Sequence, residues 1–154
     1  MIFSLMTPDE YAFWLNRSMT EYADDKMKAN GYSREEAQEI SEKSFNDLLP
    51  KGLETPNNFL FTLKSDSAQN LGFLWFAVKG PKGNQKAFIY DFVIEEQFRN
   101  KGFGRRALEL LDLEAKKLGL KEIGLHVFEF NKTAIHLYES QGYQTTDRVM
   151  SKSI

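Results

Sequence analysis

The sequence predicts a single domain of the α/β (α+β) class, in which helices flank a mixed central β-sheet. The first observation is the order of its hydrophobic patterns, which is strand, two helices, three strands, helix, strand, helix and strand. The second is the segment 71–78, which is almost continuously apolar, as in a strand covered on both faces. The third is a length of 154 residues without a repeat, low-complexity tract or linker, so residues 1–154 are expected to form one domain.

The first half of the chain is expected to supply one strand and two helices before the sheet continues. Residues 2–6 are predicted to form a short strand. Thr7 and Glu10 have the spacing of a capping box, so a helix is predicted to begin there and to end at Asn30-Gly31. Ser33 and Glu36 repeat this box at the start of a second helix, which Pro50 ends. Strands are then expected at 59–64 and 71–78.

The second half alternates strands with helices. A turn at 80–84 is expected to lead into a strand at 87–94. A helix over 105–118 follows, with Gly119 as its cap, and then a strand at 123–130. A short helix is predicted over 133–140, and the residues after Tyr143 are expected to form a final, polar strand.

The composition excludes several classes of function. The chain has no cysteine, which rules out disulfides, thiolate nucleophiles and Cys-built zinc sites, and two histidines are too few for a His-only metal site. A formal net charge of −2 gives no general attraction to nucleic acid or to an anionic membrane. No apolar stretch approaches the ~20 residues that span a bilayer, and the N-terminus lacks the pattern of a signal peptide. We therefore expect a cytoplasmic enzyme or binding protein that holds no metal.

The turn between the strand 87–94 and the helix 105–118 has the features of an anion site. Gly102 and Gly104 remove side chains, so that successive backbone N–H groups can point at one anion. The following helix adds the positive end of its dipole, and basic residues at 99, 101, 105 and 106 surround the turn. A pyrophosphate suits such a turn. Neither a Walker loop nor a dinucleotide-binding fingerprint fits the spacing.

Two motifs together resemble a known family. The stretch R-x-x-G-x-G at Arg99–Gly104 is similar to the coenzyme A signature of the GCN5-related N-acetyltransferases, the GNAT family. Downstream, Asn131, Ala134 and Tyr138, followed by Gly142-Tyr143, resemble the family's N-x-x-A-x-x-x-Y and G-F/Y. The resemblance covers the whole chain in the order of elements, and the specific motifs fall within residues 86–143.

The resemblance implies a fold and a set of cofactor contacts. Two parallel central strands, here 87–94 and 123–130, would splay apart and hold the pantetheine arm of acetyl-CoA between them. Backbone groups of the first strand would bind the pantetheine amides, the glycine turn would bind the pyrophosphate, and Asn131 would contact the arm or serve only as a helix N-cap. The implied cofactor-binding residues are Phe92, Val93, Ile94, Arg99, Asn100, Lys101, Gly102, Phe103, Gly104, Arg105 and Asn131.

The resemblance also implies the catalytic groups. Tyr138 would protonate the departing thiolate, for which a neutral phenol is suited, and its alternative role is packing under the sheet. A base is needed because an alkylammonium has no lone pair. Asp91 is the leading candidate, since an acid within an apolar strand needs a reason to be there, and a structural hydrogen bond is the alternative. Glu129, on the other splayed strand, is the second candidate.

The predicted function is transfer of an acetyl group from acetyl-CoA to a primary amine by direct attack. The acceptor would be a small molecule or a peptide, and Glu21, Asp24 and Asp25 point to a cationic one, although a solvated helix face explains them equally well. The main alternative is a non-catalytic CoA-binding regulatory module of the same fold. A nucleotide-phosphate module of another fold is a third interpretation. Homodimers are frequent in this family, and the sequence leaves monomer and homodimer open.

Overall fold

The computed structural model describes all 154 residues and contains one five-stranded sheet in the order β1-β2-β3-β4-β5. Neighbours from β1 to β4 pair antiparallel, whereas β4 and β5 are parallel. The mixed sheet predicted from the sequence is therefore confirmed. The strands are β1 (Ile2–Leu5), β2 (Asn58–Lys64), β3 (Asn70–Lys79), β4 (Lys86–Ile94) and β5 (Ile123–Leu125).

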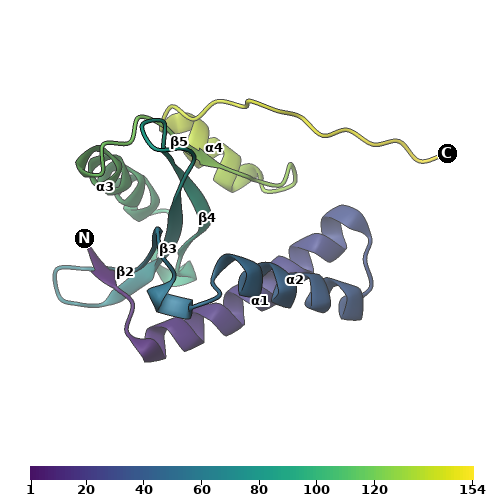
Figure 1. Ribbon diagram of the computed structural model, residues 1–154, viewed down its shortest axis with the longest axis horizontal. Helices are drawn as coiled ribbons and strands as arrows, with labels where there is room; N and C mark the ends of the chain where they lie inside the picture. The colour runs from purple at the N-terminus through teal and green to yellow at the C-terminus, as the bar shows by residue number, and fades with distance from the viewer.

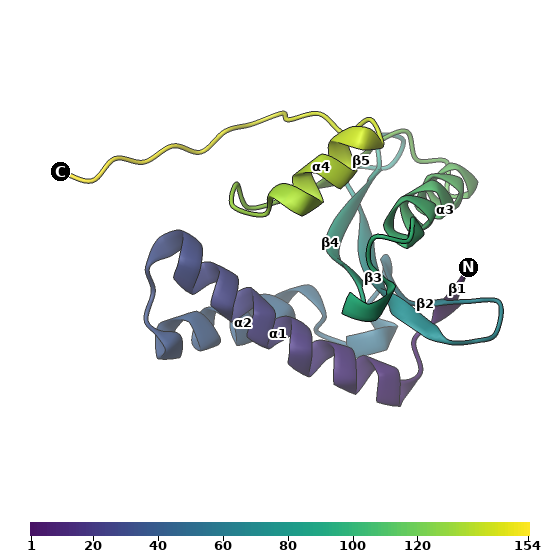
Figure 2. The ribbon, with the colours of Figure 1, turned by 180° about the vertical axis from the view of Figure 1, so that it is seen from behind.

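Four α-helices cover the two faces of this sheet (Figure 1). Helices α1 (Pro8–Asn30) and α2 (Arg34–Leu48) lie on one face, and α3 (Phe103–Lys117) and α4 (Lys132–Ser140) lie on the other, as the reverse view confirms (Figure 2). Short 3-10 turns, η1 (Gly52–Glu54) and η2 (Glu96–Phe98), precede β2 and α3. None of the helices is both long and apolar enough to span a membrane.

Each face has its own buried core. Leu108 and Leu111 of α3 pack on Leu74, Phe76 and other side chains of the sheet. On the opposite face, Trp14 of α1 and Phe45 of α2 pack against Trp75, with the two tryptophan rings 5.6 Å apart edge to face. The sheet is thus buried on both faces, which explains why the sequence of β3 is continuously apolar.

Local signals predicted the ends of the first two helices correctly. The capping boxes Thr7–Glu10 and Ser33–Glu36 are both formed, because each hydroxyl accepts from the N3 backbone N–H and each carboxylate accepts from the N-cap N–H. Gly31 ends α1 in the left-handed conformation at φ 69°. The Glu10 carboxylate also accepts from the Thr62 hydroxyl, so the start of α1 is tied to β2.

A β-bulge in β4 controls which side chains face α1. Trp75 pairs with Asp91 and Phe76 pairs with Ile89, so Tyr90 is the extra residue of β4. Before the bulge, Ile89 faces α3, and after it Phe92 and Ile94 do. Because of the extra residue, the consecutive side chains of Tyr90 and Asp91 both lie on the face toward α1.

Two predicted strands differ from the structure. The strand expected at 123–130 ends at Leu125, and the residues after Tyr143 form no strand. β5 stops early because its pairing with β4 covers only Ile123–Leu125, and the chain then turns toward α4. The C-terminal segment is extended, as expected, but it has no neighbouring strand with which to form a ladder (Figure 1).

Gly72 permits the close approach of β3 to β4 at the pair Gly72–Ile94, at the end of β4, and its replacement should be costly. A Cβ atom built at Gly72 would lie 2.0 Å from the Val93 carbonyl oxygen, and backbone atoms of both strands would have to move. We expect Gly72→Ala to lower the free energy of unfolding by about 3 kcal/mol in urea titrations.

Gly124→Ala is the matched control, because a Cβ atom there meets only the Phe88 ring at 3.8 Å. Its loss should stay within about 1 kcal/mol. Equal losses for the two variants would contradict the proposed role of the close approach.

Candidate active site

The turn that precedes α3 leaves its first backbone N–H groups free. Gly102 is the N-cap, at φ 82°, and no side chain caps the helix. The first backbone hydrogen bond of the helix runs from Arg106 N–H to Gly102 O at 3.0 Å, so the N–H groups of residues 103–105 have no protein acceptor. Asn100 is also in the left-handed region, at φ 57°. This geometry provides several donors and a helix dipole for one anion.

The basic side chains around this turn lie at the surface. Arg99 donates through Nε to the Ile94 carbonyl at 2.9 Å, and Lys101 donates to the Gln97 carbonyl at 2.8 Å. Arg106 pairs with Glu109, whereas Arg105 is exposed and has no ion-pair partner. The structure thus brings the predicted phosphate-binding residues together, and among their basic side chains that of Arg105 makes no hydrogen bond or ion pair.

The outer edge of β4 is open beyond Ile89, where its pairing with β5 ends. Glu95 N–H donates to Leu71 O, and alternate residues of an antiparallel strand turn their backbone groups the same way, so Val93 faces β3. Phe92 and Ile94 therefore turn their backbone groups toward the open edge. Of the three predicted contacts on this strand, two have groups available there, whereas the Val93 groups point at β3.

Asp91 is held between the sheet and α1. Its Oδ2 accepts from Trp14 Nε1 at 2.7 Å and from the Ser18 hydroxyl at 2.9 Å. Burial raises the pKa of Asp91, while the hydrogen bonds from Trp14 and Ser18 and the charge of Arg17 act in the opposite direction. Asp91 thus makes structural hydrogen bonds, the alternative role that the sequence allowed, and its pKa is raised at the same time.

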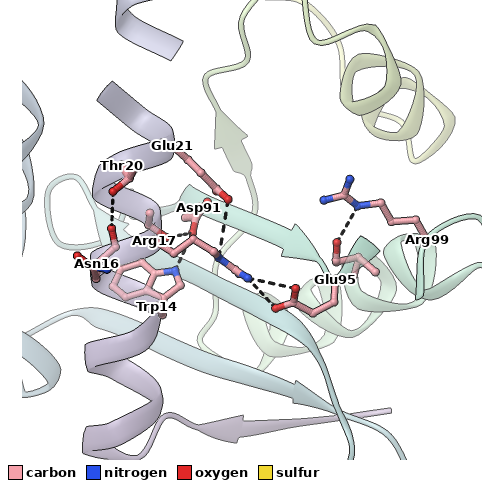
Figure 3. Close-up of polar contacts among 10 residues, drawn as sticks. Trp14, Asn16, Arg17, Thr20, Glu21, Asp91, Glu95 and Arg99 are labelled. Atoms are coloured by element: carbon pink, nitrogen blue, oxygen red, sulfur yellow. Dashed lines mark hydrogen bonds and ion pairs between the residues drawn. The ribbon is translucent and has the colours of Figure 1, made fainter. Parts of the chain in front are cut away.

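Further acidic side chains lie near Asp91, and Arg17 lies between two of them, Glu21 and Glu95 (Figure 3). Arg17 Nη1 binds both oxygens of Glu95, at 2.8 and 3.1 Å, and its Nε lies 3.8 Å from Glu21 Oε1. Burial is also the main cause of the raised pKa of Glu21 and Asp25, and the charge on Asp91 contributes to both. By contrast, Asp24 points to Arg34 at 3.7 Å.

Tyr138 of α4 packs on the opposite side of β4. Its ring lies 6.5 Å from Phe92 and 5.5 Å from Tyr143. Burial raises the pKa of Tyr138, and the charges of Tyr143 and Asp91 act in the same direction. The phenol is therefore protonated throughout the physiological range, and the Asp91 carboxylate is close enough to affect it.

The other two predicted residues lie at the start of α4. Asn131 is the N-cap and accepts from Ala134 N–H at 3.3 Å, which is the local role that the sequence also allowed. Glu129 is exposed and pairs with Lys132 at 2.6 Å, and this hydrogen bond and charge lower the pKa of Glu129. Such a carboxylate is a weaker base than Asp91. No group of three or more His, Cys, Asp or Glu side chains could hold a metal ion.

Residues 6–143 match the model of the Acetyltransferase (GNAT) family. The chain belongs to this family. Its uncharacterized N-acetyltransferase relative YycN, from Bacillus subtilis (strain 168), is 42% identical over 97% of this chain and 96% of its own length. A second relative from that strain, the uncharacterized N-acetyltransferase YdgE, is 33% identical over 100% of this chain and 99% of its own length. The protein is accordingly an acyltransferase, of a family whose co-substrate is acetyl-CoA.

Solved structures agree with the GNAT fold. The crystal structure of YycN superimposes with a TM-score of 0.94 at 41% identity, covering 99% of this chain and 98% of that chain. An aminoglycoside 6'-N-acetyltransferase from Acinetobacter baumannii shares the fold alone, at 12% identity and a TM-score of 0.62, over 99% of this chain and 97% of that chain.

Arg17 and Glu95 belong to the polar cluster beside Asp91, and the sequence assigned neither of them a role. Arg17 also lies over the rings of Phe13 and Phe73, at 5.4 and 5.3 Å. A signal was present in α1, where the polar Ser18 shares one helical stripe with Trp14. A serine in an apolar stripe needs a polar partner, and here that partner is Asp91 on β4.

The raised pKa of Asp91 predicts how stability depends on pH. A carboxyl whose pKa is higher in the folded state stabilises the fold while it is protonated, and this contribution is lost as the pH rises through the raised pKa. Asp91→Asn keeps an acceptor for Trp14 and Ser18 and cannot ionise. We expect it to gain stability relative to the wild type as the pH rises from 4 to 8. The gain is about 1.4 kcal/mol for each tenfold difference between the acid dissociation constants of the folded and unfolded states.

Urea unfolding at a series of pH values measures this difference. Glu39→Gln is the control, since Glu39 is exposed on α2 and makes no ion pair, and its difference from the wild type should be flat. A flat profile for Asp91→Asn would show that the buried carboxyl titrates normally.

Proposed function

We propose that this GNAT enzyme transfers an acetyl group from acetyl-CoA directly to a primary amine, with Asp91 as the base and Tyr138 as the acid. The observation that carries the proposal is the Asp91 carboxylate, which lies within an otherwise apolar strand, with a raised pKa, next to the open edge of β4. A carboxylate with an elevated pKa is a better proton acceptor near neutral pH than an ordinary one.

The cofactor contacts follow from the free backbone groups. The N–H groups of residues 103–105 would bind the pyrophosphate, with Arg105 supplying a further positive charge. The backbone groups of Phe92 would bind the pantetheine amides on the open edge of β4. The Ile94 carbonyl already accepts from Arg99, and the Ile94 N–H would stabilise the oxyanion of the thioester. Asn131 would lie near this arm, and its side chain already accepts the hydrogen bond that caps α4.

Proton transfer completes the reaction. The amine nitrogen forms a bond to the thioester carbonyl carbon, and the C–S bond breaks. Asp91 takes one proton from the ammonium, through water where needed, before the nitrogen attacks. As the C–S bond breaks, Tyr138 gives its proton to the thiolate, and the second proton lost from the nitrogen returns to Tyr138 through solvent. Tyr138 is suited to this role because burial keeps it protonated. The two groups lie on different sides of β4, so each reaches the reacting centre from its own side.

The acceptor is proposed to be cationic. Glu21, Asp25 and Asp91 share a region in which the charge on Asp91 raises the pKa of the other two, so a positive charge there relieves their repulsion. Two of the three acidic residues singled out in the sequence, Glu21 and Asp25, therefore belong to this surface. Asp24, which is turned to Arg34, contributes little to it.

Tyr138→Phe tests catalysis against a module that only binds coenzyme A. We expect kcat for acetyl transfer to a panel of amines to fall about 100-fold, because the thiolate loses its proton donor. Affinity for coenzyme A, measured by calorimetry, should change less than about twofold, since the phenol is assigned no role in ground-state binding.

Tyr143→Phe is the matched control for this substitution. Its ring lies 5.5 Å from Tyr138, and its buried hydroxyl has no hydrogen-bond partner, so the loss of that hydroxyl should leave kcat unchanged. Undiminished transfer by Tyr138→Phe would refute the acid role, and absence of coenzyme A binding by the wild type would refute the function as a whole.

Replacing each candidate base with the corresponding amide, Asp91→Asn or Glu129→Gln, tests which of the two carboxylates is the base. Asp91→Asn should lower kcat at least about 100-fold and abolish the decline in rate that we expect of the wild type as the pH falls through the raised pKa of Asp91. Glu129→Gln should retain the wild-type pH–rate profile, because Glu129 is exposed and paired with Lys132. The reverse pattern would transfer the role of base to Glu129.

A further inference from the structure

The segment 91–95, at the end of β4, carries groups assigned to the reaction and is supported on one edge only. Asp91 is the proposed base, and Phe92 and Ile94 turn their backbone groups to the open edge. Pairing with β5 ends at Ile89, so β3 alone holds this segment in the sheet. The other contacts of the segment therefore decide how firmly the reacting groups are placed.

One turn of α1 contacts both ends of this segment (Figure 3). Trp14 and Ser18 bind the Asp91 carboxylate at 2.7 and 2.9 Å. Arg17, on the same helical turn, binds both oxygens of Glu95 at 2.8 and 3.1 Å. Because a strand rises about 3.3 Å per residue, the two attachment points lie about 13 Å apart along the chain. The residues that face the open edge lie between them.

Glu95 is the residue at which β4 passes into the phosphate-binding turn. Its N–H donates to the Leu71 carbonyl at 2.9 Å. The carbonyl of the preceding residue, Ile94, accepts from Arg99 Nε at 2.9 Å. The ion pair of Arg17 with Glu95 therefore joins α1, which carries the acidic side chains of the proposed acceptor region, to the point where the proposed donor site begins.

The burial of this ion pair indicates a role besides stability. The side chains of Arg17 and Glu95 are 23% and 22% exposed, so both charges are largely withdrawn from water. Nε and Nη2 of Arg17 are buried and make no hydrogen bond. Buried donors without partners destabilise a fold, and an apolar contact between α1 and β4 would avoid that cost. The pair is better explained by the position and the charge that it supplies to the segment 91–95.

We propose that Arg17 and Glu95 form a positioning pair, which holds the segment 91–95 against α1 so that the Asp91 carboxylate and the Ile94 N–H keep their relative positions. This inference rests on the proposed function, in which Asp91 is the base and the Ile94 N–H stabilises the oxyanion. Arg17 and Glu95 act through these two residues and take no proton themselves.

The two charges of the pair act on Asp91 in opposite directions. The Arg17 cation lowers the pKa of Asp91. A carboxylate such as Glu95 raises the pKa of its acidic neighbours, as it does that of Glu21. Asp91 also raises the pKa of groups on α1 and α4, and a lysine of β3 binds the phenol beside it on β4; these groups are Glu21, Asp25, Tyr138, Lys79 and Tyr90.

A double-mutant cycle tests whether the two residues act as a unit. Arg17→Met keeps a long side chain over Phe13 and Phe73 without the charge. We expect Arg17→Met, Glu95→Gln and the double variant each to lower kcat about tenfold, because any of them releases the same segment. The probes are acetyl-CoA and the fastest acceptor among butylamine, spermidine and a lysine-containing peptide. Affinity for coenzyme A, measured by calorimetry, should change less than about twofold, since the pair lies outside the phosphate-binding turn.

Lys43→Met and Asp47→Asn are the matched controls, because their ion pair is exposed and joins two residues of α2. Both variants should retain the wild-type kcat. Unchanged kcat in Arg17→Met and Glu95→Gln, or losses that multiply to about 100-fold in the double variant, would overturn the proposal.

A direct titration of Asp91 gives a readout that a purely structural contact would not produce. The NMR resonance of the labelled Asp91 carboxyl carbon is assigned by its absence from Asp91→Asn. Its midpoint should move to higher pH in Arg17→Met and to lower pH in Glu95→Gln, since one variant removes a positive neighbour and the other a negative one. Midpoints that move in the same direction, or do not move, would contradict the pair even if none of the probe amines is acetylated.

These measurements also separate the positioning pair from the proposed function. If Asp91→Asn keeps the wild-type pH–rate profile, Asp91 is not the base and the proposed function fails, while non-additive losses and opposite shifts would still support the pair. If Asp91→Asn behaves as expected but the cycle is additive, the positioning pair fails and the proposed function stands.

Discussion

The extra residue in β4 is the constraint on which the site depends. Because Tyr90 bulges, Asp91 faces α1, where Trp14 and Ser18 hold its carboxylate, while Phe92 and Ile94 keep their side chains in the core beneath α3. A regular strand would place Asp91 against Leu108 and Leu111, where an acid without a partner is very costly. One inserted residue thus lets a single strand direct its carboxylate to one face of the sheet and its apolar side chains to the other.

Arg17 keeps the acidic region around Asp91 compatible with folding. Its guanidinium binds Glu95 directly and lies over the rings of Phe13 and Phe73, so a charge that lowers the pKa of nearby carboxyls is fixed in place. Glu21 and Asp91 nevertheless keep raised pKa values, because burial outweighs the charge of Arg17, and at Asp25 burial likewise outweighs the charge of Lys28. The region therefore has more acidic than basic side chains, which suits a surface that receives a transient positive charge.

The sequence predicted those features that depend on nearby residues. Capping boxes connect residues three apart, and the glycine turn before α3 is contiguous, so both could be located from the chain alone. The contact of Trp14 with Asp91 joins residues 77 apart, and the bulge appears only when β3 and β4 are paired. Sequence patterns also could not show that Val93 turns toward β3, because the direction of its backbone groups follows from that same pairing. The end of β5 and the fate of residues 144–154 depend on which strand lies beside them.

The uncapped start of α3 links the stability of the enzyme to its donor. Three N–H groups without acceptors at residues 103–105 make this helix end weak in the free protein, and the phosphates of coenzyme A would act as the missing cap. A ligand that binds only the folded state stabilises it by mass action, in proportion to the logarithm of its concentration. The lifetime of the enzyme in a cell would then follow the supply of coenzyme A, and a shortage of the donor would reduce the amount of enzyme as well as its rate.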